Sequence, residues 1–171
     1  MSPQHTEFVK RNEQYVANFG NKGDLAMPPA KKLIIVTCMD ARLDPAAHLG
    51  IKEGDAHIIR NAGGMVKDEL RSIIISQRLL GTREVAIFHH TDCGMLTFAS
   101  DDVRSIVKDA AKGDAVVAAK VDAIDFLPFK DLEGSVKADV AWLKNEPLVL
   151  PETTITGWVY DVKSGKVSQV V

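Results

Sequence analysis

The sequence of 171 residues is poor in cysteine and has no long apolar run. Its two cysteines, Cys38 and Cys93, are too few for a disulfide framework, so in a reducing compartment we expect thiols or metal ligands. No apolar run approaches the roughly 20 residues that a membrane-spanning helix needs. Residues 1–10 lack the basic patch and the hydrophobic stretch of a secretory signal. These absences favour a cytoplasmic protein with no membrane partner.

The chain also lacks an excess of basic charge. Its 21 Lys and Arg residues against 23 Asp and Glu residues give a net charge of −2, so we expect no nucleic-acid partner. Apolar residues make up 46% of the sequence, enough to build the core of one domain of this length. Composition therefore indicates a globular protein and leaves its function open.

Strand patterns alternate with helix patterns along most of the chain. The β-branched run LIIVT at residues 33–37 predicts a strand buried on both faces. Further strands are expected at 56–59, 84–88 and 153–161, with a turn at 163–166 before 167–171, and helices at 68–80, 100–113, 114–126 and 131–145. This order predicts an α/β fold with a mixed, mainly parallel sheet flanked by helices.

Residues 1–31 are expected to form an N-terminal helical arm and linker. Phe8, Tyr15 and Phe19 recur at a spacing typical of a thin amphipathic helix. The glycines and the Pro-Pro pair of GNKGDLAMPPAKK cannot continue that helix. The aromatic stripe then covers either the chain's own core or a partner subunit, and we favour the partner. Residues 32–171 form the predicted catalytic domain.

Chemically active residues follow two of the predicted strands. Cys38 comes after the first strand, and His90 and Cys93 come after the third, three residues apart. Because the carboxyl ends of parallel strands meet at one edge of the sheet, these side chains should converge. Two thiolates and an imidazole favour zinc, and three ligands leave an open position, as in catalytic sites. The alternative is that both cysteines are small buried apolar residues. His89 should point to the opposite face of the strand and pack there.

Asp40 and Arg42 follow Cys38 at alternating positions. The Asp40 carboxylate can then reach the metal or its water, and a guanidinium can hold a carboxylate through two parallel hydrogen bonds. A surface ion pair of little energetic weight is the alternative. We also hypothesise a switch in which Asp40, released by Arg42, takes the open metal position at low pH.

The segment RNAGG at residues 60–64 follows the second predicted strand and is expected to line the same crevice. Its glycines, Gly63 among them, allow close approach of the backbone. The sequence after it predicts an apolar wall for a small uncharged substrate, formed by Ala62, Met65, Val66 and Leu70.

These motifs together resemble the β-class carbonic anhydrases. The resemblance rests on Cys-x-Asp-x-Arg at 38–42, Arg-Asn-Ala-Gly at 60–63 and His-x-x-Cys-Gly at 90–94, and extends over residues 32–162. It implies that Cys38, His90 and Cys93 bind Zn²⁺ and that Asp40 and Arg42 form a catalytic dyad. It also implies a homodimer or homotetramer, with the N-terminal helix crossing onto the partner.

The implied activity is reversible hydration of carbon dioxide to bicarbonate by a zinc-bound hydroxide. Gly63 and Gly94 are the expected substrate-binding residues. Many family members have glycine where this chain has His89, and Met95 after Gly94 is another departure. Such differences resemble a compact branch in which some members hydrolyse carbonyl sulfide or carbon disulfide, so this activity stays an alternative. A non-catalytic metal-binding or redox-sensing module is a second alternative.

Overall fold

The computed structural model describes residues 3–171, so the first two residues of the predicted arm lie outside the described residues. A five-stranded sheet has the order β2-β1-β3-β4-β5. The β2–β1, β1–β3 and β3–β4 pairs are parallel, and β5 runs antiparallel to β4. The strands are β1 (Leu33–Cys38), β2 (Ala56–Asn61), β3 (Glu84–His90), β4 (Thr154–Tyr160) and β5 (Val167–Gln169). The predicted mixed, mainly parallel α/β fold is confirmed.

Six α-helices are found in the described residues: α1 (Phe8–Ala17), α2 (Pro45–Leu49), α3 (Leu70–Leu80), α4 (Ser100–Ala110), α5 (Ala115–Asp122) and α6 (Leu132–Asn145). Short 3-10 helices lie at Gln4–Glu7, Lys22–Asp24, Ala62–Gly64, Val66–Glu69 and Gly94–Leu96. Each predicted helix is present, although α5 ends at Asp122 and not near residue 126. Residues 3–171 contain no helix whose length and hydropathy would let it span a bilayer.

Helices α3 and α6 cover one face of the sheet. Alternate residues of β1 and β3 point into this layer and form the main core with side chains of both helices. Its central members are Ile34, Val36, Val85, Ile87, Ile73, Val140 and Leu143, all buried. This layer holds β1 and β3 in register, so their carboxyl ends lie side by side.

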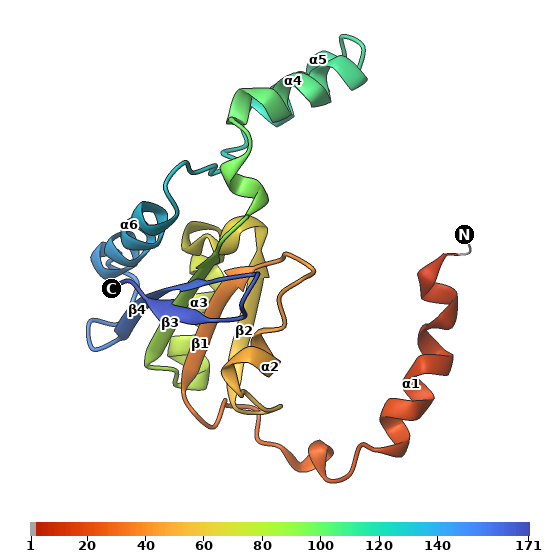
Figure 1. Ribbon diagram of the computed structural model, residues 1–171, viewed down its shortest axis with the longest axis vertical. Helices are drawn as coiled ribbons and strands as arrows, with labels where there is room; N and C mark the ends of the chain where they lie inside the picture. Colours follow the sequence, from red (N-terminus) through yellow and green to blue (C-terminus); the bar gives the residue numbers. More distant parts are fainter. Residues whose placement is uncertain (1–2) are drawn as a thin grey trace.

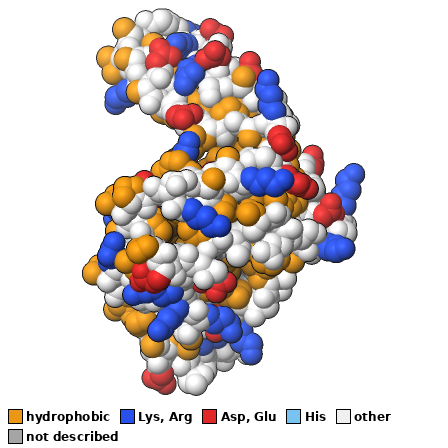
Figure 2. Space-filling model, turned by 90° about the vertical axis from the view of Figure 1, so that its left-hand side faces the viewer, with side chains coloured by type: hydrophobic (Ala, Val, Ile, Leu, Met, Phe, Trp, Pro, Cys, Tyr) orange, Lys and Arg blue, Asp and Glu red, His pale blue; other side chains and the backbone are white. Residues whose placement is uncertain are grey.

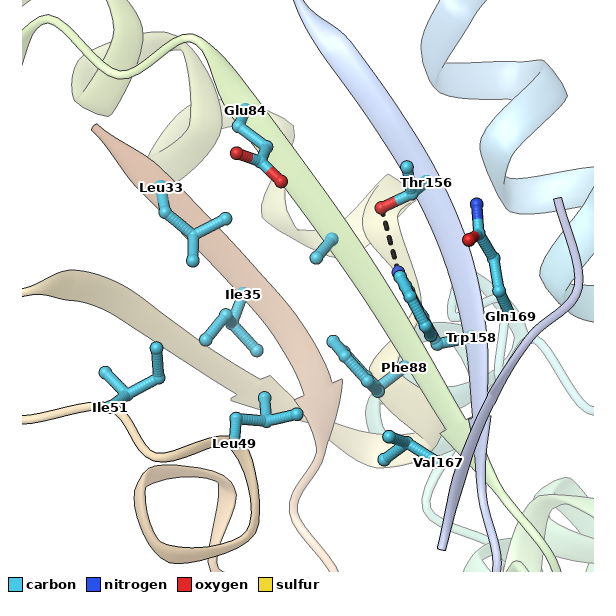
Figure 3. Close-up of a pocket in the computed structure, with 11 residues that line it drawn as sticks. Leu33, Ile35, Leu49, Ile51, Glu84, Phe88, Thr156, Trp158, Val167 and Gln169 are labelled. Carbon is cyan, nitrogen blue, oxygen red and sulfur yellow. Dashed lines mark hydrogen bonds between the residues drawn. The ribbon is translucent and has the colours of Figure 1, made fainter. Parts of the chain in front are cut away.

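The opposite face of the sheet is only partly covered. Ile35, Phe88 and Trp158 line a groove of about 320 Å³, with Leu49 and Ile51 of the α2 region on one side (Figure 3). Phe88 and Trp158 stack with ring centroids 5.8 Å apart. Parallel sheets are normally covered on both faces, so this face lacks a layer in the single chain.

Two segments stand away from the body of the molecule. Helix α1 lies apart from the sheet, and the α4–α5 hairpin projects from the far end (Figure 1). In the space-filling view the hairpin joins the body through a narrow neck (Figure 2). No residue of α1 is buried, and Phe8 and Val16 are exposed. The arm is nevertheless tied to the core where it ends, because the Tyr15 hydroxyl donates a 2.5 Å hydrogen bond to Glu53.

Candidate metal centre and active site

The predicted convergence at the edge of the sheet is present. Cys38 ends β1, His90 ends β3, and Cys93 follows on the next turn. All three are buried, and one donor atom of each lies within 4.8 Å of the other two. This place is where the chain order reverses across the sheet, since β1 lies between β2 and β3. Ligand sites of open α/β sheets form at such a reversal.

His90 presents one nitrogen to the two sulfur atoms. Its Nδ1 lies 2.9 Å from the Thr91 carbonyl oxygen, which can only accept, so Nδ1 carries the proton. Nε2 is therefore an acceptor, and among residues 3–171 it is buried without a hydrogen-bond partner. A buried polar atom without a partner is costly. A metal ion would satisfy this lone pair, and a backbone carbonyl on the other ring nitrogen is the usual support of a ligating histidine.

The two thiols share their protons unequally. Hydrogen bonding with Cys93 lowers the pKa of Cys38 to about 4 against the effect of burial, and His90 and the Gly63 N–H act in the same direction. The contact with Cys38 and then burial raise the pKa of Cys93. The pair thus holds a thiolate poised for a cation, and a divalent ion would displace the remaining proton. This donor chemistry fits zinc, with one coordination position left open by the protein.

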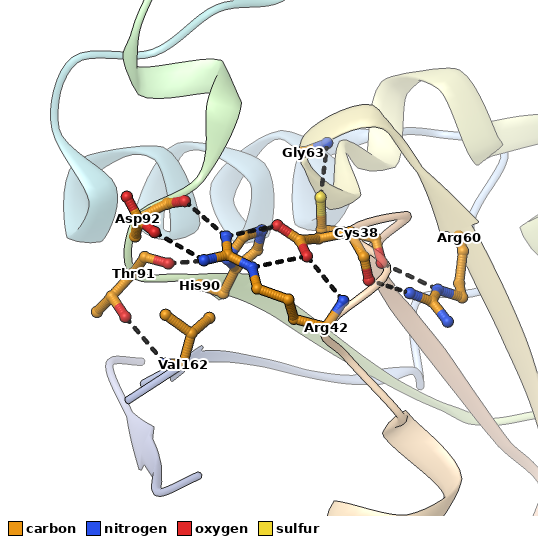
Figure 4. Close-up of polar contacts among 9 residues, drawn as sticks. Cys38, Arg42, Arg60, Gly63, His90, Thr91, Asp92 and Val162 are labelled. Carbon is orange, nitrogen blue, oxygen red and sulfur yellow. Dashed lines mark hydrogen bonds and ion pairs between the residues drawn. The ribbon is translucent and has the colours of Figure 1, made fainter. Parts of the chain in front are cut away.

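Asp40 lies against this group and is held by Arg42. Arg42 Nη2 and Nε donate to the two Asp40 oxygens at 2.7 and 3.0 Å, and the Arg42 backbone N–H donates to Oδ1 at 2.9 Å (Figure 4). These bonds hold the pKa of Asp40 well below its usual range. Asp40 Oδ2 lies 3.8 Å from His90 Nε2. An ionised carboxylate therefore lies beside the three donor atoms and lines the adjoining cavity.

The RNAGG loop is shaped by its glycines. The Gly63 N–H donates to Cys38 Sγ at 3.4 Å. Gly64 has φ +75°, and a Cβ there would meet the Phe88 carbonyl oxygen at 2.9 Å, so glycine lets the loop lie against both strands. Asn61 closes the loop, donating to the Met65 carbonyl at 2.7 Å and accepting from the Met65 N–H at 2.8 Å.

A cavity of about 480 Å³ opens beside the metal centre. Its lining is mainly apolar and includes both predicted glycines: Cys38, Met39, Asp40, Ala62, Gly63, Cys93, Gly94, Met95 and Phe98. Only Ala62 of the predicted apolar wall lies here. Val66 and Leu70 instead pack against the core under α3 and α6, and Met65 lines a separate cavity beside α6. The prediction was wrong for these three because the loop turns away from the site after Gly64.

His89 lies on the other side of β3, as predicted. It is fully buried, with Nδ1 2.7 Å from Ser135 Oγ and Nε2 3.3 Å from Asp139 Oδ2. Asp139 Oδ2 also accepts the Val66 N–H at 3.2 Å. This network joins α6 to β3 and to the end of the glycine loop. Ser135 and Asp139 carry no sequence signal for this role beyond the helical periodicity of α6.

Asp92 is a residue near the site that the sequence patterns did not single out. Its carboxylate and its carbonyl oxygen both accept from Arg42 (Figure 4). Its position beside Cys93 was visible in the sequence, but its left-handed backbone, with φ +55°, was not.

A mainly parallel sheet that carries two sulfurs and an imidazole at the carboxyl ends of β1 and β3, with a further coordination position open, defines an α/β metalloenzyme of the zinc type. The family model described as carbonic anhydrase matches residues 33–167. The chain belongs to the β class of the carbonic anhydrase family, in which a Cys-His-Cys site of this kind is typical of zinc.

Individual relatives agree with this placement. The beta-carbonic anhydrase 1 of Mycobacterium tuberculosis is 43% identical over 165 residues, covering 96% of each chain. A solved carbonic anhydrase from Glaciozyma antarctica has 54% identity and a TM-score of 0.90, covering 95% of each chain. The carbon disulfide hydrolase of Saccharolobus solfataricus is 37% identical, covering 94% of this chain and 85% of the relative.

Proposed function

We propose that this chain catalyses the reversible hydration of carbon dioxide to bicarbonate, in a catalytic domain formed by residues 32–171. The observation that carries this proposal is the position of Asp40, whose carboxylate lies beside a three-donor group and lines the apolar cavity next to it. In the reaction, the oxygen of water bonds to the carbon of carbon dioxide, and one proton leaves to solvent. The beta-carbonic anhydrase 1 relatives support the same activity.

Cys38, His90 and Cys93 would hold the zinc ion, which when bound supplies a Lewis acid that makes water a nucleophile at neutral pH. Asp40 accepts a hydrogen bond from the attacking water and so orients it toward the cavity. Because Arg42 lowers the pKa of Asp40, this carboxylate stays ionised and can only accept. Arg42 thereby fixes both the charge and the direction of Asp40.

The cavity suits a small, uncharged, linear substrate. Ala62, Met95 and Phe98 give it apolar walls, which accept a molecule without hydrogen-bond donors at little desolvation cost. Gly94 supports substrate binding by leaving space, since a Cβ at this position would meet no atom within 4 Å. Gly63 supports it through its N–H bond to Cys38 and its lack of a side chain against Met95.

The deciding experiment measures carbon dioxide hydration by stopped flow with zinc-replete protein. We expect rapid hydration that falls to the background rate in Cys38→Ser, which lacks one sulfur ligand. A zinc-replete protein with one bound ion per chain that gives only the background rate would overturn the proposal.

Hydrolysis of carbon disulfide or carbonyl sulfide is a second candidate. The observation in its favour is the 37% identity to a carbon disulfide hydrolase, together with a cavity whose apolar walls do not distinguish these gases. Sulfide release, measured in parallel with carbon dioxide hydration on the same preparation, separates the two activities. The non-catalytic metal-binding or redox-sensing alternative predicts either a closed metal shell or no metal with easily oxidised thiols. The group found in residues 3–171 has three donors and so does not form a closed shell of four.

We propose further that the protein is a homodimer or a dimer-based tetramer, in which α1 of one chain covers the open face of the partner's sheet. The groove lined by Phe88 and Trp158 needs an apolar layer, and the exposed stripe of α1 supplies one. A reducing cytoplasm would keep Cys38 and Cys93 free for metal, as both are here.

Light scattering and Trp158 fluorescence test this arrangement. Phe8→Glu places a charge on the aromatic stripe, so we expect the oligomer to dissociate. The fluorescence emission of Trp158 should then shift to the red, because its indole ring becomes exposed to solvent. Gln14→Glu adds the same charge on another face of α1 and should leave the assembly intact. A wild-type chain that is monomeric at micromolar concentration contradicts the proposal.

A further inference from the structure

Arg42 has a second acidic partner that the proposed reaction does not use. Its Nη1 donates to Asp92 Oδ2 at 2.7 Å, and its Nη2 donates to the Asp92 carbonyl oxygen at 2.9 Å. The Asp92 side chain is 72% exposed and that of Arg42 is 49% exposed. An isolated ion pair with this exposure contributes little to folding stability. The Arg42–Asp92 pair is therefore better explained by what it does to the position of the Arg42 guanidinium.

The backbone of Asp92 makes this double contact possible. Asp92 has φ +55°, a left-handed conformation that aspartate and asparagine adopt more readily than other residues with a side chain. It lies in the turn that joins His90 to Cys93. In this conformation both its carboxylate and its carbonyl oxygen accept from one guanidinium. The turn that carries two metal ligands thus also holds Arg42.

The guanidinium of Arg42 donates hydrogen bonds to two residues. Nε and Nη2 donate to the Asp40 carboxylate, Nη1 donates to the Asp92 carboxylate, and Nη2 also donates to the Asp92 carbonyl oxygen. With Asp40 alone, the guanidinium would move whenever that carboxylate moved. With Asp92 as well, it is anchored to the metal-site turn independently of Asp40. A fixed donor pair is what a carboxylate needs if it is to keep one orientation during turnover.

We propose that Asp92 is a positioning residue, which fixes the guanidinium of Arg42 so that Asp40 always meets a preformed support. The proposal rests on the proposed function, in which Asp40 orients the attacking water. Asp92 itself does not line the substrate cavity. It therefore acts through Arg42 and not on the substrate, and its loss should lower kcat and leave KM unchanged.

Two substitutions at this position separate the hydrogen bond from the backbone. Asp92→Gly removes the carboxylate without strain, because glycine accepts a positive φ. Asp92→Asn keeps an acceptor oxygen and the same backbone preference. We expect Asp92→Gly to lower kcat about threefold to fivefold, the range of one exposed charged hydrogen bond. Zinc content and KM should stay at wild-type values, and Asp92→Asn should restore kcat to within about twofold.

A double-mutant cycle shows whether Asp92 acts through Arg42. In the Arg42→Ala background, Asp92→Gly should make no further difference to kcat. The Nε–H signal of Arg42, followed by NMR in the zinc-loaded ¹⁵N-labelled protein and assigned by its loss in Arg42→Ala, provides a readout apart from activity. It should be sharp in the wild type and in Asp92→Asn, and broadened in Asp92→Gly.

Three results would overturn the proposal. They are a wild-type kcat and a sharp Arg42 signal in Asp92→Gly, an Asp92→Asn variant as impaired as Asp92→Gly, or an effect of Asp92→Gly that persists without Arg42. A zinc-loaded wild type that does not hydrate carbon dioxide would instead contradict the proposed function. In that case the Arg42 signal still tests the positioning role.

Discussion

Asp40 Oδ2 lies 3.8 Å from Nε2 of His90, while two nitrogens of Arg42 hold the same carboxylate from the other side. The carboxylate is thus close enough to act on a molecule at the metal centre and is held back from the ligand itself. The two hydrogen bonds from Arg42, and not the distance itself, favour a role for Asp40 in orienting water over a permanent role as a fourth ligand.

Replacing this carboxylate tests its role directly. We expect Asp40→Asn to keep zinc at one ion per chain but to lower kcat about 100-fold, within the range for loss of a positioned acid–base group. The reason is that an amide can turn its N–H₂ toward the attacking water and no longer accepts at both positions. Stopped-flow hydration and metal analysis on the same samples provide the measurement.

Asp101→Asn is the matched control for that variant. Asp101 is also paired with an arginine, at 2.8 Å from Arg104, but its side chain is 92% exposed on α4. It should retain full activity. Wild-type turnover in Asp40→Asn would remove Asp40 from the mechanism.

Adding a methyl group at the two cavity glycines should have different effects, on activity at Gly94 and on stability at Gly63. In Gly94→Ala the methyl enters open space. We expect the melting temperature to stay within about 2 °C, while kcat/KM falls about tenfold because substrate space is lost. Thermal unfolding and steady-state hydration kinetics measure the two quantities.

Gly63→Ala should instead act on stability. Gly63 has φ +86°, and a Cβ there would lie 2.9 Å from Cγ of Met95. Backbone strain and this contact together should lower the free energy of unfolding by about 1–2 kcal/mol. For the other glycine, a Gly94→Ala variant with wild-type kcat/KM would show that Gly94 does not border the substrate.

How far the sequence predicts this site depends on whether residues lie on regular elements. Cys38, His90 and Cys93 could be brought together from the sequence because strand ends in a parallel sheet share an edge. The apolar wall could not, since two glycines with positive φ reverse the loop and send Met65 and Val66 elsewhere. Phe98 enters the cavity from a segment without a periodic pattern.

Helix α2 was not predicted from the sequence for a related reason. It is only five residues long, too short for apolar periodicity to show. Its start was nevertheless encoded: Asp44 accepts the Ala47 N–H at 3.2 Å, Pro45 occupies the first turn, and Gly50 ends the helix with φ +66°. Local capping signals therefore identify short elements that periodicity does not.

The buried network at His89 should matter for stability more than for chemistry. Asp139→Ala removes the partner of His89 Nε2 and the acceptor of the Val66 N–H. We expect the free energy of unfolding to fall by about 2–4 kcal/mol, as for other buried groups left unpaired. Asp139→Asn keeps an acceptor oxygen, so its free energy of unfolding should fall by clearly less. Urea unfolding of zinc-loaded protein measures both; equal losses would show that hydrogen bonding is not the cause.

The last prediction concerns the point where the arm leaves the core. Tyr15 donates to Glu53, and this hydrogen bond raises the pKa of Tyr15 above its ordinary value. Because the folded pKa is raised, the contact is fully present below about pH 10, the ordinary pKa of tyrosine, and is lost as pH rises through the raised value. Lys22, whose Nζ lies 4.6 Å from the centre of the Tyr15 ring, lowers the pKa of Tyr15 and so partly offsets the effect of Glu53.

Absorbance of tyrosinate at alkaline pH measures this contact, since the chain has only two tyrosines. In Glu53→Ala, the titration step of Tyr15, assigned by its loss in Tyr15→Phe, should move to lower pH, because the acceptor and its negative charge are gone. Glu13→Ala removes an exposed carboxylate of α1 for which the structure gives no bond to Tyr15, and it should leave the titration unchanged. Glu53→Ala should also make the segment after α1 easier to cleave by protease, because the arm then lacks its tie to the core. Identical titration curves for Glu53→Ala and the wild type would show that Tyr15 and Glu53 are not in contact in solution.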